Sequence, residues 1–345
     1  MGDQMHDLLQ PDYTKSIAEV FATTTQYFIL QNKSLDPICG WQTQGRRDLP
    51  SWIPDYSLGQ TKAGVSIIGE YGKDGIFSAS GCAEEGRYDV GTSPPQSWST
   101  LPVTVLCLDS ISIISPRCLE DAGFSAIEQI WSRTILDAAH IFCQEAKHLE
   151  SSIIVVSRAV HSYRKYWELA QPIRLVTPPS SPVSDCTLAA KIIRHKELKF
   201  DIINNGNRDF VNMYIHFLLC GSITPTARVY DEDVEVITGL NVPEGPLTSD
   251  EDPVWLICEA FEKGMKNRVL AVTSKGSMCV LPEDAQKNDI VCVLHGCSVP
   301  VLLRKTPSPT SYMFVSACYM YGFMDGEAIA MHRNRTLVEE EMNLV

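Results

Sequence analysis

The chain has 345 residues, of which 44% are hydrophobic and 21% are charged, a composition typical of a folded globular protein. Its formal net charge of −13 argues against a nucleic-acid-binding protein, because affinity for phosphates comes from clustered Lys and Arg. The N-terminus has no apolar signal segment, and no apolar stretch is long enough to span a membrane. We therefore expect a cytoplasmic protein that binds neither nucleic acid nor membrane.

The chain contains twelve cysteines, but no C-x-x-C motif. The closest pair, Cys292 and Cys297, begins in an apolar run that resembles a strand. Several other cysteines lie in hydrophobic stretches, where a free thiol behaves as a small apolar side chain. We expect reduced thiols and no structural metal site.

The first predicted element is a helix over Asp12–Gln31, where apolar residues recur at helical spacing. A rigid, extended loop is expected at Leu49–Ser57, because two prolines flank Trp52. The pattern then changes to short strands, which we expect at Ile76–Gly81 and Leu101–Ile114.

The middle of the chain is predicted to be mainly helical. Ser125–Tyr166 has the apolar periodicity of a helix, and a further helix is expected around Trp255–Gly264. Between them, Thr177–Ser184 (TPPSSPVS) is typical of a linker or surface loop.

The C-terminal part contains five short apolar runs separated by turn signals. These are Val269–Thr273, Met278–Leu281, Ile290–Leu294, Val299–Leu303 and Tyr312–Tyr321. Such spacing predicts a small antiparallel barrel or rolled sheet. The expected fold class is α+β, with a helical body and short antiparallel strands over residues 1–265. A C-terminal β module over 266–330 packs on that body, and 331–345 form a tail.

Three blocks of the sequence resemble the C-terminal portion of fungal heterokaryon-incompatibility (HET-type) proteins. The first is PDYTKSIAEVFATTTQYFI (Pro11–Ile29), and the second is LPSWIPDYS (Leu49–Ser57). The third begins with RVLAVTSKGSMCVLPEDAQKNDIVCVLHGCSVPVLLR (Arg268–Arg304) and continues with YMFVSACYMYGFMDGEA (Tyr312–Ala328). The motifs of the family's N-terminal effector block do not precede Pro11. The resemblance therefore implies a HET-derived scaffold that lacks this block and its output.

The familiar catalytic and cofactor signatures, including G-x-G-x-x-G, the P-loop, G-x-S-x-G and H-E-x-x-H, are missing. We therefore expect no cofactor. His295 follows an apolar run and precedes Gly296, which predicts a position at a strand end or turn. Polar groups beside an apolar wall suit a small-molecule pocket. His295, Arg304 and Tyr321 are the candidate catalytic residues; the alternative for His295 is a turn residue with satisfied hydrogen bonds.

Six further residues are candidates for substrate binding. They are Trp52, Asp55 and Tyr56 in the rigid loop, Tyr319 beside Tyr321, and Asp325 and Glu327 around Gly326. A rigid aromatic segment can line a cavity, but a Trp between prolines is also suited to plug a core. The acidic pair and Asp55 can equally serve turns and caps.

Two functions from different classes fit these features. The favoured one is a cofactor-independent enzyme of fungal secondary metabolism, a cyclase or isomerase, including a pericyclic reaction of the Diels-Alder type. It would bind an apolar small molecule and accelerate the reaction by holding reactive groups together. The other is a non-enzymatic interaction or regulatory protein related to heterokaryon incompatibility. A homo-oligomer is compatible with either function.

Overall fold

The computed structural model describes residues 13–39, 48–58, 77–81, 99–117, 133–134, 222–224, 227–228 and 268–345. The chain divides into two compact units. We call Met1–Ser112 with Asp284–Val345 the ring unit, and Ile113–Glu283 the hairpin unit. The sequence-based division, with boundaries at 265 and 330, differs from this one because the ring unit takes strands from both ends of the chain.

The N-terminal helix is confirmed as α2 (Ile17–Asn32), which begins a few residues later than predicted. Its start is set by a capping box, in which Ser16 and Glu19 each accept a backbone N–H from the other residue. Lys33 ends the helix in the left-handed conformation, with φ of 49°. The inward face of α2 is made of small or branched residues, namely Ala18, Ala22, Thr25 and Ile29.

The segment after α2 connects it to the ring unit's sheet. The backbone N–H of Leu35 and the hydroxyl of Ser34 both donate to the carbonyl of Gly296, at 2.9 and 2.8 Å. The short helix α3 (Asp36–Cys39) follows, and the Asp36 carboxylate accepts the N–H of Ser298 at 2.7 Å. The helical N-terminus is thereby fixed to the turn between two strands.

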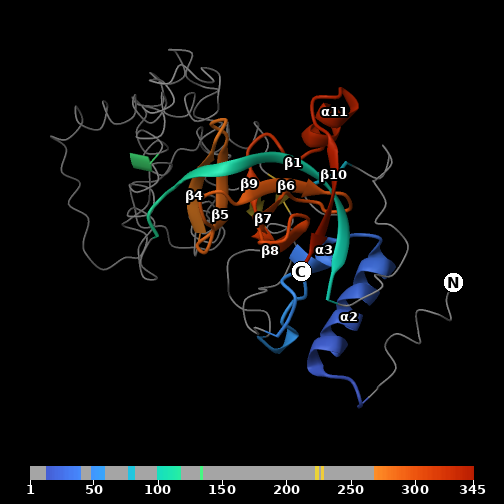
Figure 1. Ribbon diagram of the computed structural model, residues 1–345. Helices are drawn as coiled ribbons and strands as arrows, with labels where there is room; N and C mark the ends of the chain where they lie inside the picture. Colours follow the sequence, from blue (N-terminus) through green and yellow to red (C-terminus); the bar gives the residue numbers. More distant parts are fainter. Residues whose placement is uncertain are drawn as a thin grey trace, which may run out of the picture. The chain divides into compact units, whose positions relative to one another are not determined.

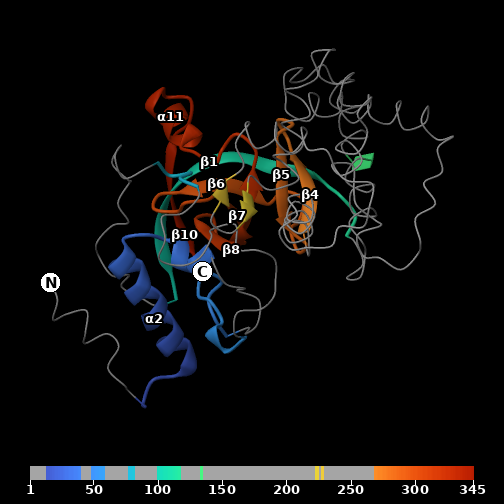
Figure 2. The ribbon, with the colours of Figure 1, turned by 180° about the vertical axis from the view of Figure 1, so that it is seen from behind.

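Five strands of the ring unit close on themselves. They are β1 (Leu101–Ile114), β6 (Ile290–Leu294), β7 (Val301–Lys305), β8 (Ser311–Ala317) and β10 (Glu339–Leu344). β6 pairs with β1 and β7, and β7 with β8, in antiparallel order. β10 pairs parallel with β8 and antiparallel with β1, which closes the ring (Figures 1 and 2). Each of the five strands therefore pairs with a ring strand on both of its sides.

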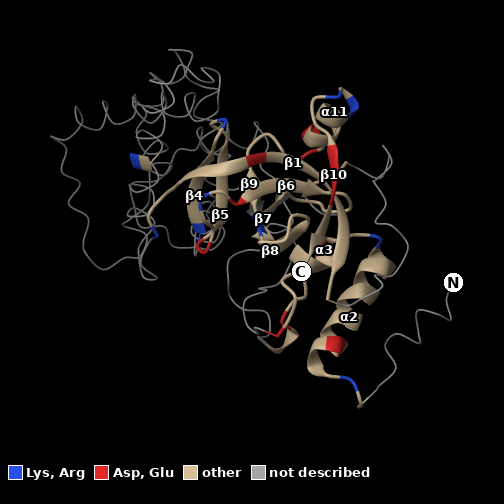
Figure 3. Cartoon of the chain, viewed as in Figure 1, with Lys and Arg blue, Asp and Glu red and all other residues tan. Residues whose placement is uncertain are grey.

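The ring is filled by apolar side chains from all five strands. Each strand contributes at least one buried apolar residue, for example Val105 of β1, Val293 of β6, Leu302 of β7, Phe314 of β8 and Leu344 of β10. Along β10, Met342 and Leu344 are buried on one face, whereas Glu340 and Glu341 are exposed. The acidic side chains of β10 lie next to α11 (Glu327–Arg333), whose last turn carries basic residues (Figure 3).

The barrel prediction is confirmed at the level of a ring-like, strand-rich C-terminal region, but its strands differ from those expected. Two of the five predicted runs form β4 (Arg268–Thr273) and β5 (Met278–Pro282), a hairpin in the hairpin unit. The ring is completed by β1 and by β10, and the latter comes from the segment assigned to a tail. The β8–β10 pair is parallel, so the ring is not wholly antiparallel.

The hairpin of β4 and β5 turns at Ser274–Ser277. Gly276 has φ of +84°, a conformation that favours glycine. β1 continues beyond Ile114 into this unit, where the N–H of Ser115 donates to the carbonyl of Leu270 at 2.8 Å. The hydroxyl of Ser115 in turn accepts the N–H of Leu270 at 3.1 Å. The remaining described strands are β2 (Ser222–Thr224) and β3 (Ala227–Arg228) in this unit, and β9 (Tyr319–Met320) in the ring unit.

One predicted strand is wrong. Residues 77–81 of the predicted strand Ile76–Gly81 form a turn, because their N–H groups donate to loop carbonyls instead of a neighbouring strand. Ser78 donates to Met324, Ala79 to Ser298 and Ser80 to Cys297. Of the predicted helix Ser125–Tyr166, the structure describes only residues 133–134, which are helical.

The predicted helix around Trp255–Gly264 and the loop at Thr177–Ser184 lie outside the described residues. Within the described ranges, no helix is both long and apolar enough to cross a membrane.

Candidate functional site

His295 occupies the position that the sequence predicts, directly after β6. Gly296, with φ of +86°, turns the chain toward β7. The backbone N–H of His295 donates to the carbonyl of Thr104 on β1 at 3.0 Å. The side chain is buried, with 8% of the residue exposed. This fixed position in the ring wall makes His295 the centre of the candidate site.

A carboxylate and a second imidazole accompany His295. The Nε2 atom of His295 lies 3.4 Å from Oε1 of Glu339, at the start of β10. The Nε2 atom of His332, in the last turn of α11, lies 3.2 Å from the same oxygen. We call these three residues the His–Glu–His cluster. One carboxylate oxygen therefore lies within reach of two imidazoles.

Hydrogen bonding orients the second imidazole of the His–Glu–His cluster. Nδ1 of His332 lies 3.2 Å from the carbonyl of Leu337, which can only accept a proton. Nδ1 therefore carries a hydrogen, and Nε2 faces Glu339. A hydrogen bond between Nε2 and Glu339 requires a further proton on one of the two groups. The cluster is thus arranged to share or transfer a proton.

The electrostatic environment favours the neutral form of His295. Burial lowers its pKa below the usual value, and a positive charge on His332 would act in the same direction. The carboxylates of Glu339 and Glu341 oppose the shift. A neutral imidazole at ordinary pH can accept a proton from a bound molecule. Among the residues that the structure describes, no group of three potential ligands is arranged to hold a metal ion.

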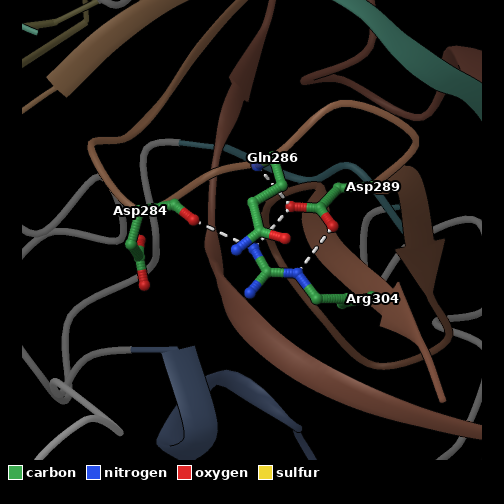
Figure 4. Close-up of polar contacts among 4 residues, drawn as sticks. All are labelled: Asp284, Gln286, Asp289 and Arg304. Carbon is green, nitrogen blue, oxygen red and sulfur yellow. Dashed lines mark hydrogen bonds and ion pairs between the residues drawn. The ribbon is translucent and has the colours of Figure 1, made fainter.

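Arg304, the second candidate catalytic residue, is engaged elsewhere. Its Nε donates to Oδ1 of Asp289 and a terminal nitrogen donates to Oδ2, both at 2.8 Å. The same terminal nitrogen donates to the carbonyl of Asp284 at 2.9 Å (Figure 4). Asp289 also accepts the N–H of Gln286. The bidentate contact raises the pKa of Arg304. This arrangement stabilises the turn before β6 and holds the guanidinium in place.

Comparison with known families gives one match. Residues 254–338 match the family model of the Het-6 β-barrel domain. The match agrees with the resemblance to a C-terminal portion of HET-type proteins and confirms it. Comparison with curated proteins and with solved structures finds no match.

The Het-6 match covers β4 to α11 and stops directly before β10. The observed ring therefore includes two strands, β1 and β10, from outside the matched residues. His295 and His332 lie within the match, and Glu339 is the first residue beyond it.

The other candidates within the Het-6 match serve turns and packing. Tyr319 is buried in β9, with its ring centre 6.3 Å from that of Phe77. Tyr321 follows on the turn after β9 and is partly exposed. Glu327 accepts the backbone N–H of Asp325 at 2.7 Å across Gly326, which precedes α11. This contact is the turn role that was the alternative for the acidic pair.

The three candidates before the Het-6 match lie in the described segment 48–58, and one of them, Tyr56, contacts α2. Trp52 is fully buried, and its indole Nε1 has no hydrogen-bond partner among the described residues. Asp55, only 2% exposed, accepts the N–H of Ser57 at 3.0 Å. The hydroxyl of Tyr56 lies 3.0 Å from that of Thr25, and burial raises its pKa. Trp52 is therefore a core residue, Asp55 serves a turn, and Tyr56 contacts the helix.

Sequence reasoning missed two of the three members of the His–Glu–His cluster. His332 and Glu339 lie in the segment 331–345, which was predicted to be a tail. The alternation that marks β10 was the available signal, because Met342 and Leu344 alternate with polar residues. The contacts of the cluster depend on ring closure, which no local pattern encodes.

Proposed function

We propose that the chain is a non-enzymatic interaction protein of the heterokaryon-incompatibility class. It acts in the cytoplasm and binds a HET-type protein through the outward face of α2. Two observations support this proposal: the Het-6 β-barrel match and a row of exposed apolar side chains on α2. The second observation carries it, because it identifies a surface.

The exposed row consists of Ile17, Val20 and Phe28, which are 51%, 42% and 36% exposed. Thr24 lies between the last two at helical spacing, so these residues share one face. The opposite face is buried against the ring unit. Scattered exposed apolar residues are ordinary, but three on one helix face favour a docking surface.

The contacts of three candidate site residues, one catalytic and two for substrate binding, also favour an interaction protein. Arg304 is held by Asp289, and Glu327 is used at the start of α11. Trp52 is a fully buried packing residue. A small-molecule site needs several polar groups directed at one volume, and these residues have structural partners or positions instead.

The proposal is tested by titrating the purified chain into a purified full-length HET-type protein in a calorimeter. Substituting Val20→Gln and Phe28→Gln together should weaken binding about tenfold or more, as expected for a hot-spot pair. Met313→Gln is the matched control, because Met313 is an apolar residue that is 45% exposed on a different element, β8. Equal affinity of the double variant and the control, or no binding by the unaltered chain, would contradict the proposal.

A second candidate is a cofactor-independent cyclase or isomerase of fungal secondary metabolism, including a pericyclic enzyme, acting on an apolar small molecule. The His–Glu–His cluster favours it, because two imidazoles on one carboxylate suit proton transfer in an isomerisation. The test compares metabolites from a host that makes candidate intermediates, with the unaltered chain and with Glu339→Gln. Product profiles that do not respond to the chain would rule out this candidate.

A further inference from the structure

Two cysteines lie opposite each other on neighbouring strands of the ring. Cys107 on β1 is directly opposite Cys292 on β6 in the antiparallel register. Their sulfur atoms lie 3.6 Å apart. Directly opposite residues of antiparallel strands have Cα atoms about 4.5–5.5 Å apart, which lies within the range that disulfides span. The backbone therefore already has the geometry that a disulfide requires.

The two thiols differ in accessibility. Cys107 is partly exposed, whereas Cys292 is fully buried. A dissolved reagent can therefore reach Cys107 first, and Cys292 is available only to a group already attached to Cys107. This arrangement is the one that an attacking thiol and a resolving thiol need.

The local electrostatics match this division of roles. The hydrogen bond from the Cys292 thiol lowers the pKa of Cys107. The same bond, together with burial, raises the pKa of Cys292. Glu340, on the neighbouring β10, opposes ionisation of both thiols, and Cys318 opposes that of Cys292. The accessible thiol is thus the one that ionises first.

We propose that Cys107 and Cys292 form a thiol–disulfide exchange site that reacts with low-molecular-weight disulfides of the glutathione class. The Cys107 thiolate attacks one sulfur of oxidised glutathione, whose S–S bond breaks and releases one glutathione thiolate. The Cys292 thiol then loses its proton to solvent and attacks the Cys107 sulfur, which releases the second glutathione. Two protein thiols are oxidised, and one glutathione disulfide is reduced to two thiols.

The product is a disulfide between β1 and β6, two neighbouring strands of the ring. These residues are 185 positions apart in the chain, so the bond would close a long loop and restrict the unfolded chain. Oxidation would therefore raise the thermal stability of the ring unit. This inference is independent of the proposed docking surface on α2, which contains neither cysteine.

A second thiol pair provides an internal comparison. The sulfur atoms of Cys39 and Cys297 lie 3.7 Å apart, almost the same separation. Both residues are buried, and burial raises the pKa of Cys297. The distance between the sulfur atoms is therefore almost the same in the two pairs, whereas solvent exposure differs. We expect the Cys39–Cys297 pair to remain reduced under conditions that oxidise Cys107 and Cys292.

The experiment treats the folded full-length chain with oxidised glutathione, blocks the remaining thiols and maps disulfides by peptide mass spectrometry. We expect a Cys107–Cys292 disulfide, with Cys39 and Cys297 blocked as free thiols. Cys292→Ala should retain glutathione on Cys107, since no resolving thiol remains. Cys107→Ser should abolish both products, and circular dichroism confirms that each variant is folded.

Three outcomes would overturn the proposal. The first is a folded, unaltered chain in which Cys107 and Cys292 stay reduced. The second is a disulfide from Cys292 to Cys318 instead of Cys107. The third is simultaneous oxidation of Cys39 and Cys297 at the same rate, which would mean that access does not select the pair. The unaltered chain alone distinguishes these outcomes, so the test does not depend on the stability of a variant.

Discussion

Arg304 on β7 binds both carboxylate oxygens of Asp289, 15 residues earlier in the chain, at 2.8 Å each. The carboxylate is almost completely buried, with 2% of its side chain exposed, whereas the guanidinium is 25% exposed. A buried carboxylate without its cation is strongly unfavourable. The pair therefore stabilises the turn before β6, and through it the strand that directly precedes His295.

Removal of this guanidinium should destabilise the chain. We expect Arg304→Ala to lower the free energy of unfolding by about 3–5 kcal/mol, because Asp289 is left buried and uncompensated. Arg304→Lys should cost about 1–3 kcal/mol, since an ammonium cannot make the bidentate contact. Urea unfolding measures both. The exposed neighbour Lys305→Ala is the control, and an Arg304→Ala variant as stable as this control would contradict the structural role.

The pKa of His295 predicts a pH dependence of stability. Burial lowers the folded pKa below the unfolded value of about 6.5. The stabilisation is therefore complete above about pH 6.5 and is lost as the pH falls through the lower folded pKa. Thermal unfolding between about pH 7.5 and pH 5 should show a falling midpoint, and His295→Gln should flatten the slope. Parallel slopes for both proteins would exclude His295 as the titrating group.

Ring closure by β10 can be tested through its last buried residue. Leu344 is fully buried and lies opposite Leu101 of β1 and Tyr312 of β8. Leu344→Ala should lower the free energy of unfolding by about 2–5 kcal/mol, because it leaves a cavity where β10 meets both neighbours. Val338→Ala, at a residue that is 74% exposed, should change it by less than about 0.5 kcal/mol. Equal effects in urea unfolding would mean that β10 contributes nothing to the core.

The two faces of α2 should respond in opposite ways to substitution. Val20→Gln should change the free energy of unfolding by less than about 0.5 kcal/mol, because its side chain is 42% exposed. Ala22→Leu should cost about 1–3 kcal/mol, since Ala22 is fully buried and a larger side chain must displace its neighbours. Thermal and urea unfolding check both. A large loss for Val20→Gln would show that this face serves the core and is not free for docking.

Local patterns were sufficient where a segment's neighbours lie close in the chain. The helix α2 follows from its periodicity and its capping residues, and β4 with β5 follows from two apolar runs around Gly276. β1 was predicted with its observed bounds, because β-branched and apolar residues dominate it. The hydrophobic period is a property of each segment alone, and these elements require little else.

Local patterns were insufficient where pairing between distant segments decides the structure. β10 begins with three glutamates, which are typical of a solvated tail, and only its pairing with β1 and β8 makes it a strand. Phe77–Gly81 has strand-like residues, but the N–H groups of Ser78, Ala79 and Ser80 donate to loop carbonyls. Glu339 and His332 approach each other, and His295, only after the ring has closed. The Arg304 side chain is of a type that often serves in catalysis, but its contact with Asp289 depends on the register between β6 and β7, which the local sequence does not reveal.

The position of β1 early in the chain, far from its ring partners, has a consequence for biosynthesis. Thr104 on β1 donates to Glu341 on β10, 237 residues later. Both ring partners of β1, β6 and β10, are therefore still to be synthesised when β1 leaves the ribosome. A strand that waits in this state is prone to pair with other chains, and contacts of such high sequence separation form slowly. Production of this protein should therefore depend on chaperones that shield β1 until the last strand has been made.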